Sequence, residues 1–377
     1  MKRFAYLLAG AALFAACQSQ PDSYKIAGTI EEGSPVQDNT LAILLKYEGR
    51  NIVFLDTAKI ENKQFAFEGK ADTAQLVYLR FFNEGEGRPY TSGTCLMLEN
   101  GNITVKCQGD EKIVIGGTLS NELQNKLTVQ TDSLNSVLKT AYKAMADSTL
   151  SEEERDLKKK ELLATEEKCF QERENLYKSL IQDNIGNSFG YTYFVMHGPS
   201  LFNVEEQEAL IAKIPAEYAN SEEILEIKSR LEIEKKTAVG QKFTDFTMKT
   251  PEGEELKLSV VVAKNRLTLV DFWASWCGPC RAEMPNVVKD YKAFKDKGLG
   301  IVGVSLDNDA EKWKQAIKDL GIEWEQMSDL KGWESEGARL YNIHAIPATV
   351  LIAQDGTIVA KDLRGEELTK KLTELLK

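Results

Sequence analysis

Two cysteines separated by two residues, Cys277 and Cys280, have the type and spacing best suited to chemistry in this sequence. They follow an apolar run, residues 269–273, that predicts a buried strand, and they begin a predicted helix. A cysteine at a helix N-terminus faces unpaired backbone N–H groups and the positive end of the helix dipole. This environment lowers a thiol pKa from about 8.5 to about 7 or below, so a thiolate forms at neutral pH. Because thiolates attack disulfides, the pattern predicts thiol–disulfide exchange.

Half of a zinc site is the alternative interpretation of the same spacing. A structural zinc site needs a second pair of Cys or His ligands at similar spacing. The two histidines, His197 and His344, and the remaining cysteines are scattered singly along the chain. We therefore expect no metal site and predict no cofactor.

The first seventeen residues have the features of an export signal. Lys2 and Arg3 precede an apolar stretch, residues 4–16, that is shorter than the roughly 20 apolar residues of a transmembrane helix. Residues 13–17 resemble a bacterial lipobox, although Phe14 is larger than that motif prefers. The resemblance implies that Cys17 becomes the lipidated first residue; secretion with a free Cys17 is the alternative. We expect an exported protein of the cell envelope, anchored by its lipid and facing the periplasm.

Length and composition limit the other function classes. The 377 residues leave room for two or three domains. The 58 acidic against 47 basic side chains give no electrostatic reason to expect a nucleic-acid partner. Six cysteines are few for an exported chain, so disulfides are not expected to hold a minimal core together.

Residues 24–117 are predicted to form an antiparallel β domain. Short alternating runs separated by Gly, Asn and Asp indicate seven or eight strands in a sandwich or an open barrel. Asn100-Gly101 predicts a two-residue hairpin. In that hairpin Cys95 and Cys107 point to opposite faces, so two unbridged thiols are expected. A three-residue loop would allow the alternative, a disulfide.

Residues 118–237 are predicted to form an α-helical spacer, because apolar residues recur there at helical spacing from Leu119 to Tyr142. Residues 151–154 have the pattern of a capping box that begins a second helix. Cys169 lies in the apolar stripe of that helix and is interpreted as a core residue.

Residues 238–377 alternate between strand and helix, which predicts a mixed sheet covered by helices. Strands are expected at 267–273, 299–306 and 348–353. Asp355-Gly356 predicts a hairpin turn after the last of these.

This region resembles the thioredoxin-fold domain of the TlpA/ResA-like thiol-disulfide oxidoreductases. The resemblance rests on residues 270–280 (VDFWASWCGPC), 283–285 (EMP) and 346–349 (IPAT), and residues 239–246 resemble the added N-terminal hairpin of that family. The preceding β and helical regions resemble the N-terminal portion often attached to such domains in bacterial lipoproteins. This second resemblance indicates no activity. The fold class implied is an α/β thioredoxin-like C-terminal domain, preceded by an antiparallel β domain and an α-helical segment.

The resemblance also implies roles for the residues around the dithiol. Cys277 is expected to be the exposed attacking thiolate and Cys280 the resolving thiol, and together they form the redox disulfide. Pro279 sets the local φ and the geometry of the pair. Trp276 and Pro279 are predicted to contact the substrate.

Two carboxylates accompany the dithiol. Asp271 lies in the middle of an apolar strand, where an unpaired carboxylate is costly. The matching aspartate of thioredoxins is buried beneath the dithiol and helps to deprotonate the resolving cysteine. Glu283 follows Cys280 by three residues and therefore lies on the same helix face. We predict that one acid relays protons and the other contacts the substrate; the alternative for Glu283 is a solvated surface carboxylate.

Pro347 matches the cis-proline that lies against the dithiol in thioredoxin folds. A cis X–Pro bond leaves the Ile346 backbone available to pair with an extended substrate strand. His344 either lines the same face or packs against the protein.

These interpretations predict an extracytoplasmic reductase of protein disulfides. Its partners would be disulfide-containing client proteins and, by analogy with the family, a membrane dithiol that donates electrons. Cytochrome c maturation and antioxidant activity are roles within the family for which the sequence offers no client. The alternatives are a partner-binding lipoprotein with an auxiliary redox domain, a disulfide oxidase, or a peroxiredoxin-like enzyme.

Overall fold

A computed structural model describes the chain from residue 21 onward, apart from three short segments. The described ranges are 21–49, 51–82, 93–109 and 112–377. The chain divides into two compact units, Met1–Ala219 and Asn220–Lys377. The predicted export signal and its lipidation site, Cys17, lie outside the described residues.

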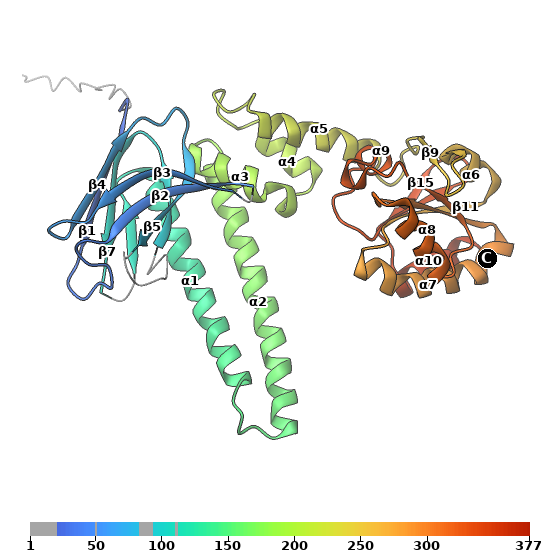
Figure 1. Cartoon of the computed structure of the whole chain (residues 1–377), viewed down its shortest axis with the longest axis horizontal. Coiled ribbons are helices and arrows are strands. Elements are labelled where there is room, and N and C mark those ends of the chain that lie inside the picture. The colour runs from blue at the N-terminus through green and yellow to red at the C-terminus, as the bar shows by residue number, and fades with distance from the viewer. Residues whose placement is uncertain (1–20, 50, 83–92, 110–111) are drawn as a thin grey trace, which may run out of the picture. The chain divides into compact units, whose positions relative to one another are not determined.

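A β-sandwich occupies the first part of the first unit (Figure 1). Its strands are β1 (Tyr24–Ile30), β2 (Leu41–Glu48), β3 (Asn51–Lys59), β4 (Gln64–Gly69), β5 (Gln75–Phe82), β6 (Gly93–Leu98), β7 (Gly101–Cys107) and β8 (Ile113–Gly116). They form two four-stranded sheets, in the orders β4-β1-β7-β8 and β3-β2-β5-β6. Buried side chains of both sheets, such as Ile26 and Leu44, belong to one core. The sandwich is the first of the two predicted architectures.

Asn100-Gly101 does not close a hairpin, so that prediction is wrong. β6 pairs with β5 in one sheet, whereas β7 pairs in parallel with β1 in the other. The turn therefore crosses between the sheets, which lets the apolar faces of both strands enter the shared core. The Asn100 side chain exchanges two hydrogen bonds of 2.9 Å with the backbone of Ala71. Cys95 and Cys107 are free thiols, as predicted, but on different sheets rather than on opposite faces of one hairpin.

The described residues of the first unit also form the helices α1 (Leu119–Met145), α2 (Glu152–Asn184), α3 (Ser188–Leu201) and α4 (Val204–Ile211). α1 and α2 lie side by side as a long antiparallel pair (Figure 1). The predicted capping box at the start of α2 is confirmed, because Ser151 and Glu154 bond reciprocally to each other's backbone N–H. Cys169 is buried in α2, as predicted for a core residue.

The second unit begins with helix α5 (Glu222–Lys236), so the predicted helical spacer is shared between the two units. Its remaining elements are β9 (Thr247–Lys249), β10 (Glu255–Lys257), α6 (Leu258–Lys264), β11 (Leu267–Trp273), α7 (Gly278–Phe294), η1 (Lys295–Lys297), β12 (Leu299–Ser305), α8 (Ala310–Asp319), β13 (Glu325–Met327), η2 (Gly332–Glu334), α9 (Glu336–Leu340), β14 (Ala348–Ala353), β15 (Ile358–Lys361) and α10 (Gly365–Leu375). The predicted strands and the mixed sheet are confirmed.

The central sheet of this unit has the order β13-β12-β11-β14-β15. β11, β12 and β13 are parallel, and β14 and β15 run antiparallel to them. Every residue of β11 and β12 is buried. Helices on both faces explain why most residues of these strands are apolar, without polar alternation (Figure 1). A buried carboxylate in β11, that of Asp271, therefore stands out.

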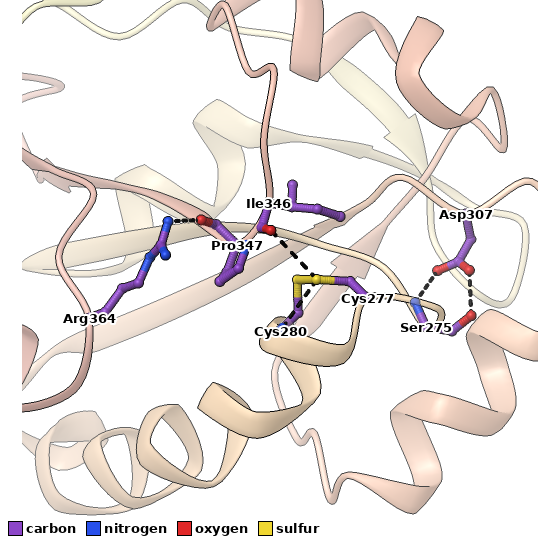
Figure 2. Close-up of a disulfide and its surroundings, with 7 residues drawn as sticks. All are labelled: Ser275, Cys277, Cys280, Asp307, Ile346, Pro347 and Arg364. Carbon is purple, nitrogen blue, oxygen red and sulfur yellow. Dashed lines mark hydrogen bonds between the residues drawn. A yellow bond between two sulfur atoms is a disulfide. The ribbon is translucent and has the colours of Figure 1, made fainter. Parts of the chain in front are cut away.

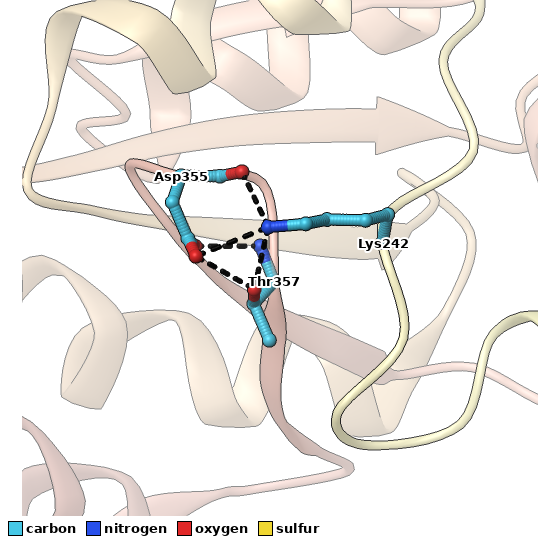
Figure 3. Close-up of polar contacts among 3 residues, drawn as sticks. All are labelled: Lys242, Asp355 and Thr357. Carbon is cyan, nitrogen blue, oxygen red and sulfur yellow. Dashed lines mark hydrogen bonds and ion pairs between the residues drawn. The ribbon is translucent and has the colours of Figure 1, made fainter.

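The segment before β9 is fastened to the turn between β14 and β15. Lys242 Nζ donates to the backbone carbonyl of Asp355 (2.8 Å), to its carboxylate (3.0 Å) and to the Thr357 hydroxyl (2.9 Å; Figure 3). The backbone N–H of Phe243 donates to the carbonyl of Gly356 at 2.9 Å. These contacts hold the segment before β9 along the sheet edge of the second unit. The antiparallel pairing of β14 with β15 confirms the predicted turn at Asp355-Gly356.

Candidate active site

Cys277 and Cys280 form a disulfide where β11 leads into α7 (Figure 2). Cys277 is the N-cap residue of α7, and Gly278 and Pro279 begin the helix. The backbone N–H of Cys280 points at the Cys277 sulfur, with an N···S distance of 3.2 Å. When the pair is reduced, this N–H and the helix dipole favour negative charge on Cys277.

The Cys277 sulfur is less accessible than the sequence predicts. Cys277 is 5% exposed and Cys280 is 1% exposed, so the expectation of an exposed attacking cysteine is wrong for the oxidised protein. The Cys277 sulfur is bonded to Cys280 and lies 3.7 Å from the carbonyl oxygen of Ile346, and both neighbours cover it.

The loop that carries this carbonyl includes the predicted cis peptide bond, between Ile346 and Pro347. The guanidinium of Arg364 donates a hydrogen bond to the Pro347 carbonyl (Figure 2). His344 is exposed and its Nε2 bonds to the Asn342 side chain at 2.7 Å. The structure therefore brings Ile346 and Pro347 to the disulfide and gives His344 a local partner.

Asp271 is buried, as predicted, with 4% of its surface exposed. It lies in the middle of β11, opposite Thr349 of β14. Burial raises the pKa of Asp271 to about 7; the negative charge of Glu283 adds to the increase and the positive charge of Arg364 opposes it. A carboxyl group with this pKa can take up and release a proton near neutral pH.

Glu283 is half-buried, so the alternative of a fully solvated carboxylate is wrong. One of its oxygens accepts the backbone N–H of Gly365 at 2.7 Å, and the other accepts from the Asn286 side chain at 3.0 Å. Gly365 is the first residue of α10. The N-cap residue of this helix, Arg364, makes no side-chain cap hydrogen bond. Glu283 therefore satisfies an N–H at the start of α10 while its charge acts on Asp271.

Comparison with known proteins places this site in a family. Residues 239–361 match the AhpC/TSA family, and residues 24–124 match a domain of unknown function, DUF4369. The chain is 36% identical over 139 residues to thioredoxin-like protein YneN of Bacillus subtilis. These residues make up 36% of this chain and 76% of that protein. The chain belongs to the thioredoxin-like thiol-disulfide oxidoreductases.

Two further proteins similar to this chain are named thiol-disulfide oxidoreductases. Thiol-disulfide oxidoreductase ResA of Bacillus cereus (strain ATCC 10987) is 28% identical over 144 residues, which are 38% of this chain and 80% of that protein. A solved structure of a thiol-disulfide oxidoreductase from Bacteroides fragilis is 38% identical, covers 36% of this chain and 99% of its own, and has a TM-score of 0.34.

A second buried carboxylate of the oxidoreductase, Asp307, supports the loop before the dithiol. It accepts the Ser275 backbone N–H at 2.9 Å and the Ser275 hydroxyl at 2.5 Å (Figure 2). The Ser305 hydroxyl donates to the same carboxylate at 2.7 Å. Asp307 was not identified from the sequence, although it directly follows the strand predicted at 299–306, which the structure shows to be parallel to β11. The carboxyl ends of neighbouring parallel strands meet at one edge of a sheet, so the position of Asp307 after this strand could have predicted that it lies near the dithiol.

Arg364 and Trp333 were also not predicted from the sequence as site residues. Arg364, the N-cap residue of α10, donates a hydrogen bond to the Pro347 carbonyl. Trp333 contacts Trp276, which was predicted to bind the substrate, with ring centroids 6.1 Å apart. Neither residue lies in a local motif, and only the folded chain brings them to the site.

Within the described parts of the chain, no helix combines the length and the apolar character needed to cross a bilayer.

Proposed function

We propose that this oxidoreductase reduces protein disulfides outside the cytoplasm, with Cys277 as the attacking residue and Cys280 as the resolving residue. The observation that carries the proposal is the Cys280 N–H directed at the Cys277 sulfur at the start of α7. It gives the two sulfurs different environments, because the N-cap sulfur receives an N–H and the helix dipole. Cys280 lies inside the first turn and is almost fully buried.

The reaction consumes the dithiol and forms the enzyme disulfide. The Cys277 thiolate attacks one sulfur of the client disulfide, the client S–S bond breaks, and the leaving client sulfur takes up a proton. Cys280 then loses its proton and attacks the Cys277 sulfur of the mixed disulfide. The second client thiolate leaves, and the Cys277–Cys280 bond forms. Two electrons pass from the enzyme to the client.

Asp271 is proposed to accept the proton that Cys280 loses. It is buried on the strand that leads directly into the dithiol, and its pKa of about 7 suits proton transfer at neutral pH. The negative charge of Glu283 raises the pKa of Asp271 and the positive charge of Arg364 lowers it, so the three side chains are electrostatically linked.

The reducing direction is proposed from the residues between the cysteines. Cys-Gly-Pro-Cys resembles thioredoxin, with a potential of about −270 mV, more than the oxidant DsbA at about −120 mV. Equilibration of the purified protein with glutathione or dithiothreitol buffers, followed by thiol alkylation, measures the potential. A value above about −150 mV would reverse the assignment in favour of an oxidase.

The location and the partners complete the proposal. A lipid on Cys17 would hold the enzyme at the cell envelope, facing the periplasm, where disulfide-containing proteins are its clients and a membrane dithiol reduces it again. Metabolic labelling with a radioactive fatty acid tests the anchor. We expect label on the full-length protein and none on Cys17→Ser, and equal labelling of both would refute lipidation at this residue.

A further inference from the structure

The five tryptophans of the chain fall into two groups by exposure. Trp273, Trp313 and Trp324 are buried, with 0%, 2% and 7% of their surface exposed. Trp276 is 52% exposed and Trp333 is 47% exposed. The two exposed indoles contact each other, with ring centroids 6.1 Å apart and planes inclined by 55°. Single exposed apolar residues are ordinary, but here both exposed tryptophans meet beside the reactive disulfide.

Trp333 is held in this position by the backbone of its loop rather than by burial of its ring. It lies in the short helix η2, which follows a loop fixed by the side chains of Ser328 and Asp329. Ser328 accepts the Leu330 N–H at 3.1 Å, and Asp329 accepts the Lys331 and Glu336 N–H groups at 3.2 and 2.9 Å. The loop is therefore ordered while the indole stays in contact with solvent.

Trp276 is fixed in a comparable way. The residue before it, Ser275, is anchored by Asp307, and the residue after it is Cys277. A polypeptide whose disulfide is attacked by Cys277 must pass next to the Trp276 ring. Residues in an extended strand are about 3.3 Å apart, so a client side chain two positions from the attacked cysteine can reach both rings.

We propose that Trp276 and Trp333 form a client-docking platform that favours disulfides flanked by an aromatic or large aliphatic side chain in an extended polypeptide. This inference rests on the proposed function and names its substrate class. Tryptophan has few rotatable bonds, so the preformed pair buries apolar area at a small entropic cost. Trp276 alone would offer one ring beside the dithiol. Trp333 adds a second ring to that surface and therefore acts as a specificity-determining residue.

The test compares three disulfides with the reduced full-length protein. Two are synthetic cystine peptides that differ only in Phe or Ser two positions from one cysteine, and the third is hydroxyethyl disulfide. We expect Trp333→Ala to lower the rate constant for the Phe peptide about tenfold, a change equivalent to about 1.4 kcal/mol. The rate constants for the other two disulfides and the redox potential should stay at wild-type values. Trp333→Phe should restore most of the loss.

Val260→Ala is the matched control, because Val260 is a similarly exposed apolar residue, 45% exposed on α6, and should leave all three rates unchanged. Equal losses of Trp333→Ala on all three disulfides would overturn the proposal, since they would assign Trp333 to general support of the site. The absence of any preference for the Phe peptide in the wild type would also overturn it, while reduction of hydroxyethyl disulfide would leave the proposed function standing. Failure of the wild type on all three would refute the proposed function itself, and the platform with it.

Discussion

The carboxylate of Asp307 accepts both the backbone N–H and the hydroxyl of Ser275, two residues before the reactive Cys277. Asp307 is only 1% exposed and lies just beyond the end of β12, next to β11 in the sheet. A third hydrogen bond, from Ser305, leaves the buried carboxylate well satisfied. The loop that presents the dithiol is thus anchored to the neighbouring strand before any client binds.

Removal of this anchor should weaken both the fold and the reaction. Asp307→Ala leaves the N–H and hydroxyl of Ser275 without their acceptor, so we expect the free energy of unfolding to fall by about 2 kcal/mol. The rate constant for disulfide reduction should fall about tenfold, because misplaced reacting groups lose their alignment. Urea unfolding followed by tryptophan fluorescence and the kinetics of insulin reduction measure the two effects.

Asp309→Ala provides the control for this prediction. Asp309 caps α8 by accepting the Glu311 and Lys312 N–H groups, so its loss should cost about 1 kcal/mol of stability without slowing reduction. If Asp307→Ala also lost stability but kept the wild-type rate, the loop anchor would have no part in the reaction.

Replacement of the resolving cysteine should trap clients. In Cys280→Ala the mixed disulfide on Cys277 cannot be released from within the protein, so client proteins should accumulate as covalent adducts. Non-reducing electrophoresis and mass spectrometry of the adducts identify them. Cys277→Ala is the matched control and should capture far fewer. Equal capture by both variants would contradict the different roles of the two sulfurs.

Local patterns predicted the features of this site that depend on neighbouring residues in sequence. The strand before Cys277, the helix after it and the burial of Asp271 all follow from the apolar run and its single carboxylate. The Asn100-Gly101 turn shows the limit of such patterns, because its conformation depends on two sheets that must share a core. Arg364 joins the site through a contact with Pro347, and no local spacing reveals that contact.

The buried carboxyl of Asp271 should make the oxidised protein less stable as pH rises. Its pKa is about 7 in the folded protein, mainly because of burial, against about 3.9 in an unfolded chain. Between about pH 4 and pH 7 the folded state holds a proton that the unfolded state has released, so the free energy of unfolding falls with pH and levels off above pH 7. The full loss is on the order of 4 kcal/mol.

Asp271→Asn should remove this loss and leave the variant more stable than the wild type at pH 8. All five tryptophans lie between residues 273 and 333, so their fluorescence follows unfolding of the second unit within the intact chain. Denaturant titrations of the oxidised wild type and variant at pH 5 and pH 8 give the comparison. Parallel pH profiles for the two proteins would show that Asp271 ionises with an ordinary pKa.

The two functions of Glu283 can be separated by two substitutions. Its negative charge raises the pKa of Asp271, whereas its oxygen accepts the N–H of Gly365 at the start of α10. Glu283→Gln removes the charge but keeps an oxygen acceptor, and Glu283→Ala removes both. We therefore expect both variants to lower the pKa of Asp271, measured by NMR of its carboxyl carbon. Only Glu283→Ala should also lose about 1 kcal/mol of stability, typical of a lost helix cap. A pKa of Asp271 that stays unchanged in both variants would show that the Glu283 charge does not reach it.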